Sequence, residues 1–364
     1  MQGDDQSVAA ATPVLRAAVV GAGYWGPNLA RNFASSDDWE LAAVCDLDRE
    51  RARAVARASK DADVETSVDE LLARDDIDAV AVATPAATHY EVVLKALRAG
   101  KHVVVEKPLA DTTERGHRMV EEARARGLVL MTDHTFCYTA AIEKVHEIIA
   151  AGELGEVLYV DSVRINLGLV QPDIDVFWDL APHDLSIMDY VLPGGLEPEW
   201  VSAQGADPIG AGKSCVGYLF LPLPGGATAH VHVNWLSPTK IRNMTIGGSR
   251  RTLVWDDLNL AQRVSVFDRG VDLATQQLNR LDRTETMVSY RLGDTWSPAL
   301  KEREALGAMI SEFADSIRGS RAPATDGAAG LRVVRILEAA TRSLASGGRE
   351  VPADVTAEPV RGLP

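Results

Sequence analysis

The feature that most constrains the fold is a regular alternation of short β-rich runs and helical stretches between Val14 and Thr135. Strand–helix alternation of this kind requires right-handed crossovers and a parallel sheet that is covered on both faces. Gly100 and Gly127 follow two of the helical stretches, where a left-handed residue ends a helix well. The expected strands are Leu15–Val20, Leu41–Cys45, Ala79–Ala83, His102–Val105 and Leu128–Met131, and the expected helices are Tyr24–Ser35, Arg49–Ala58, Thr88–Ala99 and Thr112–Arg126.

The pattern changes after the turn Gly152–Gly155, because β-rich runs then follow one another with few helices between them. Short Gly/Pro-rich turns join these runs, which indicates an antiparallel sheet. We predict a flexible tail at 1–13, a doubly wound α/β Rossmann domain at 14–135, and at 136–364 an α+β domain with a large, mostly antiparallel open sheet for substrate binding and oligomerisation. The expected later elements are strands Val157–Asn166, Glu199–Gln204, Cys215–Leu221, Ala227–Trp235, Ile241–Gly247, Thr252–Trp255 and Val264–Phe267, and helices Glu302–Arg318 and Gly327–Ser346.

Charge and cysteine content narrow the functional class. The net charge of −15 argues against a nucleic acid or an anionic membrane as the main partner. The three cysteines are far apart and form no CxxC pair, which suits a reducing compartment. No apolar run reaches the ~18 residues of a membrane span, and the first residues lack the order of a signal peptide. We therefore expect a cytoplasmic protein.

A glycine-rich turn follows the first predicted strand. Gly21-Ala22-Gly23-Tyr24-Trp25-Gly26 is a G-x-G-x-x-G sequence that opens a helix, which is the context of a dinucleotide site. Gly21 permits the tight turn, Gly23 lets the backbone approach a pyrophosphate, and Gly26 lets helix and strand pack closely. The helix N-terminus would face the phosphates, with Tyr24 and Trp25 in the same loop. The alternative is an ordinary glycine-rich turn.

Asp46 ends the next predicted strand and indicates which dinucleotide is bound. An acidic residue about 20 positions after the glycines normally holds the adenosine ribose 2′-hydroxyl, and it would repel a 2′-phosphate. We therefore expect NAD rather than NADP, although Arg49 and Arg51 keep NADP possible. Asp46 could instead cap the following helix, but Asp48 is better placed to do so.

Three further elements, in this order and spacing, resemble the Gfo/Idh/MocA oxidoreductases over roughly residues 15–190. They are Ala83-Thr84-Pro85 with His89, Gly100–Pro108 with its Glu106-Lys107-Pro108 ending, and Asp179-Leu180-Ala181-Pro182-His183. The resemblance implies that Thr84, Pro85 and His89 lie beside the nicotinamide half of the cofactor and that Glu106 positions the cofactor or Lys107. It also implies a homodimer or homotetramer. His89 could equally pack on its own helix. The flanks of the glycine-rich turn and of the Asp179–His183 element resemble members found with sugar-nucleotide enzymes.

The third element supplies a candidate base for oxidising an alcohol. A base must lie within hydrogen-bond reach of the hydroxyl proton, and the ordinary pKa of histidine suits His183 to this task. Asp179, four residues earlier, would share a helix face with His183 and fix its tautomer or bind a hydroxyl. Pro182 fits the first turn of that helix. Lys107 ends a strand at the ligand-binding edge of the sheet, and the resemblance implies that it polarises the reacting oxygen. In the alternative reading, Asp179 caps the helix and His183 is structural.

Other candidates for substrate contact are weaker. Period-two alternation places basic or polar pairs on one face of a strand, where they would suit a nucleotide diphosphate. A solvated face or an oligomer contact explains them equally well. His230 and His232 also alternate, but no carboxylate or cysteine lies at ligand spacing, so we predict no metal site. The candidates are His134, Tyr138, Arg164, Asn166, Trp178, Lys240 and Arg242.

These observations predict an NAD(P)-dependent oxidoreductase that interconverts a secondary alcohol and a ketone on a sugar or sugar-like substrate, with a sugar linked to a nucleoside diphosphate as one candidate. Lys107, Asp179 and His183 are the expected catalytic residues. The first alternative is a redox-neutral enzyme that keeps NAD bound and catalyses epimerisation or oxidation–elimination cleavage of a glycoside. The second is a dinucleotide-binding regulator without catalysis.

Overall fold

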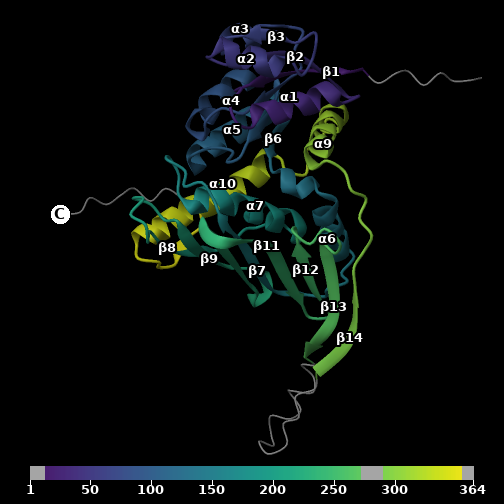
Figure 1. Cartoon of the computed structure of the whole chain (residues 1–364), viewed down its shortest axis with the longest axis vertical. Helices are drawn as coiled ribbons and strands as arrows, with labels where there is room; N and C mark the ends of the chain where they lie inside the picture. The colour runs from purple at the N-terminus through teal and green to yellow at the C-terminus, as the bar shows by residue number, and fades with distance from the viewer. Residues whose placement is uncertain (1–12, 272–289, 355–364) are drawn as a thin grey trace, which may run out of the picture.

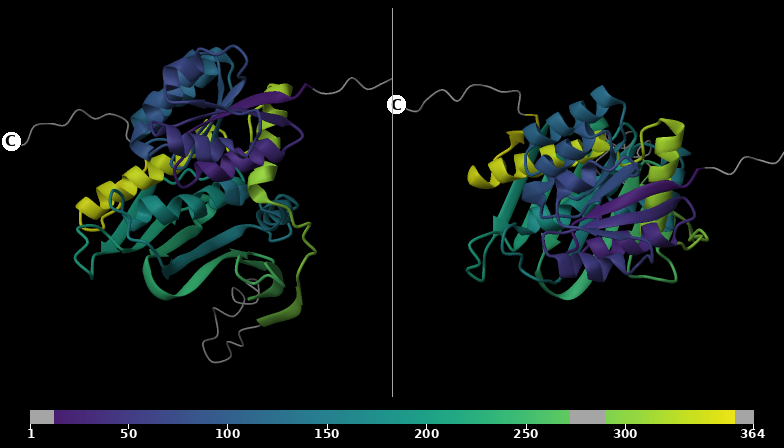
Figure 2. Two further views of the ribbon diagram at one scale, coloured as in Figure 1. Left: turned by 45° about the horizontal axis from the view of Figure 1, so that its top comes forward. Right: turned by 90° about the horizontal axis from the view of Figure 1, so that it is seen from above.

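The computed structural model describes residues 13–271 and 290–354, so all of the predicted tail except Pro13 lies outside the described residues. Two sheets organise the chain, one in each half (Figure 1). Helices α7 (Val176–Val191) and α10 (Gly327–Ala345) lie between the two sheets. Figure 2 shows the resulting layers from two further directions.

The first sheet has six parallel strands in the order β3-β2-β1-β4-β5-β6, which confirms the predicted doubly wound domain. Apart from the edge strand β3, its strands are mostly buried because helices cover both faces. The short β3 and α3 were not predicted. The strands are β1 (Leu15–Val20), β2 (Trp39–Cys45), β3 (Asp63–Glu65), β4 (Ala79–Val82), β5 (His102–Glu106) and β6 (Leu130–Asp133), and the helices are α1 (Gly26–Ser35), α2 (Arg49–Ala56), α3 (Val68–Leu72), α4 (His89–Arg98) and α5 (Thr113–Arg126).

Local signals mark where two of these helices begin or end, as the sequence predicts. The Asp48 side chain accepts hydrogen bonds from the backbone N–H groups of Glu50 and Arg51, so Asp48 rather than Asp46 caps α2. Gly127 follows α5 with φ of 65°, in the left-handed region that favours glycine. Asp46 is therefore left for another role.

The second sheet has nine strands in the order β14-β13-β12-β11-β7-β10-β9-β8-β15. β10 pairs parallel with β7 and the other described pairs are antiparallel, which confirms a mostly antiparallel sheet. Helix α6 (Ala140–Ala150) was not predicted. The strands are β7 (Val157–Leu167), β8 (Trp200–Ala206), β9 (Val216–Pro222), β10 (Thr228–Asn234), β11 (Leu236–Gly248), β12 (Thr252–Asp256), β13 (Val264–Val271), β14 (Tyr290–Trp296) and β15 (Val351–Pro352).

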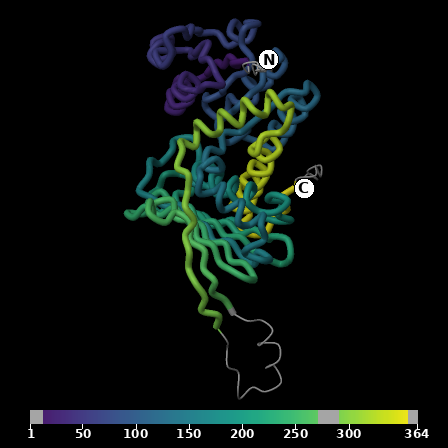
Figure 3. Tube along the Cα trace, turned by 90° about the vertical axis from the view of Figure 1, so that its right-hand side faces the viewer, coloured from purple at the N-terminus to yellow at the C-terminus, as the bar shows by residue number. Residues whose placement is uncertain are grey.

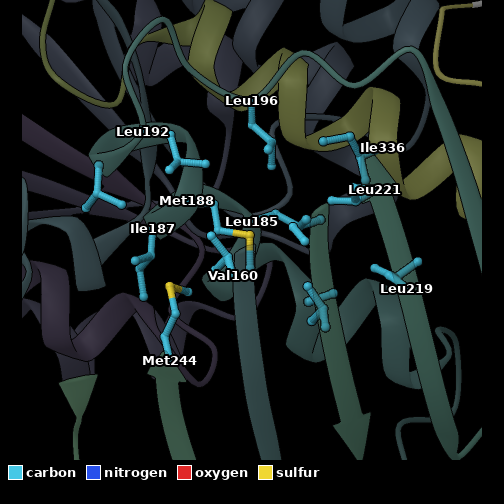
Figure 4. Packing of buried hydrophobic residues seen from close by; sticks show 14 of the residues in the cluster. Val160, Leu185, Ile187, Met188, Leu192, Leu196, Leu219, Leu221, Met244 and Ile336 are labelled. Atoms are coloured by element: carbon cyan, nitrogen blue, oxygen red, sulfur yellow. The ribbon is translucent and has the colours of Figure 1, made fainter. Parts of the chain in front are cut away.

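One face of this sheet carries the larger hydrophobic core. Alternate strand residues belong to this core: Val160 lies near Leu185 and Met188 of α7, and Leu221 lies beside Ile336 of α10 (Figure 4). The residues between them point to the opposite face, because side chains alternate along a strand. The helices therefore cover one face and leave the other open.

Helix α9 (Ala305–Gly319) lies against the first domain, although the predicted boundary assigned it to the second. The rings of Phe313 and Trp39 stack with centroids 5.4 Å apart. Trp39 Nε1 also donates a hydrogen bond to the Ile310 carbonyl at 2.8 Å. The chain thus returns to the first domain before α10 descends toward the second sheet (Figure 3). A division at residue 135 does not separate the two cores.

This packing predicts that truncating α9 destabilises the nucleotide-type domain. Phe313→Ala removes a fully buried ring, and we expect the free energy of unfolding to fall by about 3–5 kcal/mol. Asp315→Ala, on the exposed side of the same helix, should change it by less than about 0.5 kcal/mol. Urea unfolding followed by tryptophan fluorescence measures both. Equal stability of the two variants would show that α9 does not belong to that core.

Candidate active site

The glycine-rich turn has two glycines that the fold requires and one that it leaves free. Gly21 has φ of 102°, and a Cβ there would lie 2.5 Å from the Ala83 carbonyl oxygen. A Cβ at Gly26 would lie 2.0 Å from the Gly21 carbonyl oxygen. A Cβ at Gly23 would meet no atom within 4 Å. The fold itself therefore does not require a glycine at position 23. The open space there fits a backbone that a pyrophosphate approaches closely.

Two carboxylates hold this turn in place. Asp46 Oδ2 accepts a hydrogen bond from the Ala22 N–H at 2.8 Å. On the other side, Trp25 Nε1 donates to Asp133 Oδ2 at 2.6 Å. Arg51 Nη2 lies 3.3 Å from Asp46 Oδ1, and Arg51 Nε lies 3.3 Å from Asp48 Oδ2. Two carboxylates therefore already neutralise the charge of Arg51. Tyr24 is 94 % exposed at the outer side of the turn.

Lys107 and Asp179 meet across the two halves of the molecule. Lys107 follows β5, and its Nζ donates to the Asp179 carbonyl oxygen at 2.9 Å and lies 3.5 Å from Asp179 Oδ1. Trp235 Nε1, just after β10, donates to Asp179 Oδ2 at 2.9 Å. Both Lys107 and Asp179 remain partly accessible. The carboxylate is thus fixed by one group from each domain.

Helix α7 begins earlier than the sequence predicts. Asp175 caps it by accepting from the N–H groups of Phe177 and Trp178, so Asp179 is not the cap. Pro182 therefore lies inside the helix, and its predicted place in the first turn is wrong. Because proline has no N–H, the Trp178 carbonyl lacks its usual helical donor. Asp179 and His183 still share a face, four residues apart.

His183 lies one turn after Asp179, at the same end of the site. Its imidazole packs edge-on against the Phe136 ring with centroids 5.2 Å apart. Burial lowers the pKa of His183 well below its usual range, and the charges of Lys107 and Arg164 lower it further. Asp179 does not hydrogen-bond the imidazole, contrary to the predicted tautomer-fixing role. A neutral imidazole in this position can accept a proton.

Two carboxyl groups lie at the end of the parallel sheet, Asp133 buried and Glu106 partly accessible. Glu106 and Asp133 are partners across β5 and β6. Burial raises the pKa of Glu106 well above its usual range, and the neighbouring Asp133 raises it further. Burial also raises the pKa of Asp133, although hydrogen bonds from Thr135 and Trp25 oppose the shift. A protonated Glu106 can donate a hydrogen bond toward the edge of the sheet where a ligand would bind.

His89 joins two turns of the site. Its Nδ1 lies 2.9 Å from the Pro108 carbonyl oxygen and its Nε2 lies 2.9 Å from the Thr84 carbonyl oxygen. A neutral imidazole carries one N–H, so it donates to one of these carbonyls. Thr88 Oγ1 donates to Thr84 Oγ1 at 2.8 Å, and Pro85 is exposed. His89 is fully buried and positions the turns after β4 and β5.

Three of the candidates for substrate contact lie near His183. The guanidinium groups of Arg164 and Arg242 lie over the ring of Phe136. The His134 side chain is buried. Burial lowers the pKa of its imidazole to about 3, with a smaller contribution from the charge of Lys107. Neither ring nitrogen of His134 has a hydrogen-bond partner among the described residues. Such orphaned nitrogens fit contact with a ligand or water.

The other candidates have different surroundings. Tyr138 belongs to the core, where its hydroxyl hydrogen-bonds Thr325 at 2.9 Å. Trp178 Nε1 donates to Thr341 of α10 at 3.0 Å. Lys240 is exposed in the irregular part of β11, between Leu236 and Ile241. Asn166 is half-buried beside Gly168.

The alternating histidines, for which the sequence predicts no metal site, lie on the opposite face of the second sheet. His230 and His232 stack there on Tyr218, with centroids 5.9 and 4.5 Å apart. Residues 13–271 and 290–354 contain no group of three or more ligating side chains that could hold a metal ion.

Sequence reasoning missed three residues of the site. Trp235 was not among the candidates, but its indole donates a hydrogen bond to Asp179. Phe136 was not singled out, although it contacts His183. Asp184 is fully buried and binds Arg164. A carboxylate inside the apolar run of α7 was a signal that a buried cation had to lie nearby.

Comparison with known proteins agrees with this arrangement. Residues 15–134 match the family described as "Oxidoreductase family, NAD-binding Rossmann fold", and residues 142–254 match the GFO/IDH/MocA C-terminal domain. UDP-N-acetylglucosamine 3-dehydrogenase of Acidithiobacillus ferrooxidans is 31 % identical over 88 % of this chain and 94 % of its own length. A solved structure of that enzyme has a TM-score of 0.76 and 27 % identity, and covers 93 % of this chain and 100 % of its own.

Two further relatives match over part of their length. D-glucoside 3-dehydrogenase of Escherichia coli is 34 % identical over 55 % of this chain and 60 % of its own. A dTDP-3,4-didehydro-2,6-dideoxy-alpha-D-glucose 3-reductase of Streptomyces violaceoruber is 42 % identical over 34 % of this chain and 36 % of its own. Within the described part of the chain, no helix is long and apolar enough to cross a bilayer. With both family domains matched in order and a relative aligned over nearly its whole length, the chain belongs to the Gfo/Idh/MocA oxidoreductase family.

Proposed function

We propose that this protein oxidises a secondary alcohol of a sugar, or reduces the corresponding ketone, with NAD as the hydride carrier. The observation that carries the proposal is the meeting of Lys107 from the nucleotide-binding domain with Asp179 and His183 of α7. A cationic donor and a neutral base at one place are what alcohol oxidation needs from a protein. The bound nicotinamide supplies hydride transfer.

Each residue has a distinct task in this reaction. His183 takes the hydroxyl proton during oxidation and returns it during reduction. The Lys107 ammonium donates to the reacting oxygen and stabilises its developing charge. Asp179, held by Trp235, orients the Lys107 ammonium through its carbonyl and carboxylate.

The glycine turn and Asp46 are proposed to bind the pyrophosphate and the adenosine ribose. Asp46 presents its carboxylate at the end of β2 and repels a 2′-phosphate. Arg51, which could otherwise attract that phosphate, is paired with Asp46 and Asp48. This pairing favours NAD over NADP.

The names of the relatives suggest which alcohol to try first. Three of them act at position 3 of a sugar, and two of these sugars carry a nucleoside diphosphate. We therefore propose a pyranose ring with an oxidisable 3-hydroxyl as the substrate class, with nucleotide sugars tested before free sugars and inositols. Product formation without a lasting absorbance change at 340 nm would favour the redox-neutral alternative.

The open face of the second sheet is proposed to join copies of the chain into a homodimer or homotetramer. Its strands expose Tyr159, Tyr218 and Phe220, each between 39 and 46 % exposed. Exposed aromatic side chains on a sheet face without covering helices favour an interaction surface. The family resemblance points to the same assembly.

Replacing the central glycine should separate cofactor binding from folding. Gly23→Ala places a methyl group where the protein has no atom within 4 Å, so its thermal stability should stay near wild type. The same methyl group would obstruct the pyrophosphate, and we expect the Kd for NAD to rise at least about tenfold. Gly26→Ala collides with the Gly21 carbonyl and should destabilise the fold itself. Calorimetric titration and thermal melts measure both effects. Unchanged NAD affinity in Gly23→Ala would contradict the assigned cofactor site.

Removing either catalytic group should slow the reaction without preventing NAD binding. We expect Lys107→Met and His183→Asn each to lower kcat by about 10²–10⁴-fold, the usual contribution of such groups. Lys95→Met and His117→Asn remove the same residue types from the exposed surfaces of α4 and α5 and serve as controls. NADH formation with UDP-N-acetylglucosamine and related sugars is the measurement, repeated with NADP. Full activity of both site variants would refute the proposed roles.

Light scattering tests the proposed assembly. We expect the wild-type protein to have two or four times the mass of the 39.1 kDa chain at micromolar concentration. Phe220→Lys places a charge on the open face and should shift the population toward single chains, because a buried unpaired charge is costly. A wild-type mass of one chain would exclude this use of the face.

A further inference from the structure

Phe136 lies at an unusual junction of charged groups on the inner face of the second sheet. The Arg164 guanidinium carbon is 4.6 Å from the centroid of its ring, and that of Arg242 is 5.0 Å away. Arg164 and Arg242 stand directly opposite each other on β7 and β11. Like charges in that register repel, so the arrangement needs groups that compensate them.

Carboxylates and the ring itself provide this compensation. Arg164 donates to Asp184 through Nε at 2.6 Å and Nη2 at 3.1 Å, and both side chains are almost completely buried. Arg242 Nη1 donates to Asp257 Oδ2 at 2.6 Å. The face of Phe136 attracts both cations. The paired donors of Arg164 are therefore committed within the protein rather than offered to a substrate.

The same ring contacts His183. The two rings meet at 71° with centroids 5.2 Å apart, in the edge-to-face geometry that aromatic pairs prefer. Asp184, which anchors Arg164, is the next residue along α7. Phe136 thus touches the His183 ring while the Arg164–Asp184 pair fixes the adjacent turn of the helix.

No hydrogen bond joins the His183 imidazole to another described residue. In many enzymes a carboxylate or carbonyl orients the catalytic imidazole by such a bond. Here Asp179 is bound to Trp235 and faces Lys107. The packing of an aromatic ring is therefore what restricts the orientation of the imidazole.

We propose that Phe136, held by the guanidinium groups of Arg164 and Arg242, is a positioning residue that orients the His183 imidazole and keeps water away from it. This inference rests on the proposed function. It also assigns Arg164 and Arg242 to the support of the base, instead of the substrate contact that the sequence suggests.

The groups around His183 set the protonation state of its imidazole. Lys107 from β5, Arg164 from β7, Arg242 from β11 and His134 after β6 all disfavour the imidazolium, in addition to burial. Asp184 and Asp257 partly offset the two arginines, and Asp179 offsets Lys107. Without the Phe136 ring, water can solvate His183 and the guanidinium groups. The pKa of His183 would then rise toward its usual 6.5.

The decisive experiment measures the titration of His183 directly. The protein is labelled with ¹³C at histidine Cε1, and the signal of His183 among eight histidines is assigned by its loss in His183→Asn. We expect His183 of the wild-type protein to stay neutral well below pH 6.5. In the Phe136→Leu variant, we expect the pKa of His183 to lie closer to 6.5. Cys137→Ala, a buried neighbour in the same turn that contacts Ser186 instead, should leave the titration unchanged.

Kinetics then separates positioning from general instability. Phe136→Leu should lower kcat by about 10–100-fold, because misplacing a reacting group is costly, while the KM for the sugar stays within about twofold. Its acid limb of activity should move to higher pH. Phe136→Tyr keeps the ring, so its kcat and the position of its acid limb should both stay near those of the wild-type protein. An unchanged titration in Phe136→Leu, or equal shifts in Cys137→Ala, would overturn the inference. Absence of turnover with every sugar would count against the proposed function alone, since the titration needs no substrate.

Discussion

The contact between Lys107 and Asp179 is the constraint on which the site depends. It joins the end of a parallel strand to a helix of the other domain, and Trp235 fixes the carboxylate from the second sheet. Each partner is held by its own core, so the geometry is set before any ligand arrives. Preorganisation of this kind is what allows a donor to stabilise charge without rearranging.

The charge around the site is balanced locally, in contrast to the acidic surface. The whole chain carries −15, yet three cations surround His183. Each of them has a carboxylate partner, and that of Arg164 is completely buried. Because a cation is expensive to bury without a partner, the pairs let the protein place positive charge beside a neutral imidazole.

Most of the fold could be predicted from local sequence patterns, whereas most of the site depends on contacts between residues far apart in the sequence. Strand–helix alternation, the glycine turn and the cap at Asp48 depend on residues close in sequence, so they could be predicted. Helix α6 was not predicted, although Ile142, Val145 and Ile149 recur at helical spacing in the segment that follows the predicted division at 135. The contacts of Asp179 with Trp235 and of Phe136 with Arg242 depend on strand register across distant segments, which spacing does not reveal.

The return of α9 to the first domain has a mechanical consequence. The chain crosses between the domains after β6, again before α9, and once more along α10, which contacts α5 and β6 as well as α7 and β8. Several crossings and a shared helix resist large hinge rotation between the halves. A fragment cut at residue 135 would leave the indole of Trp39 and the rings around it without their cover. The structural division between the two cores therefore does not coincide with any single cut of the chain, because α9 and α10 each contribute to packing on the first sheet.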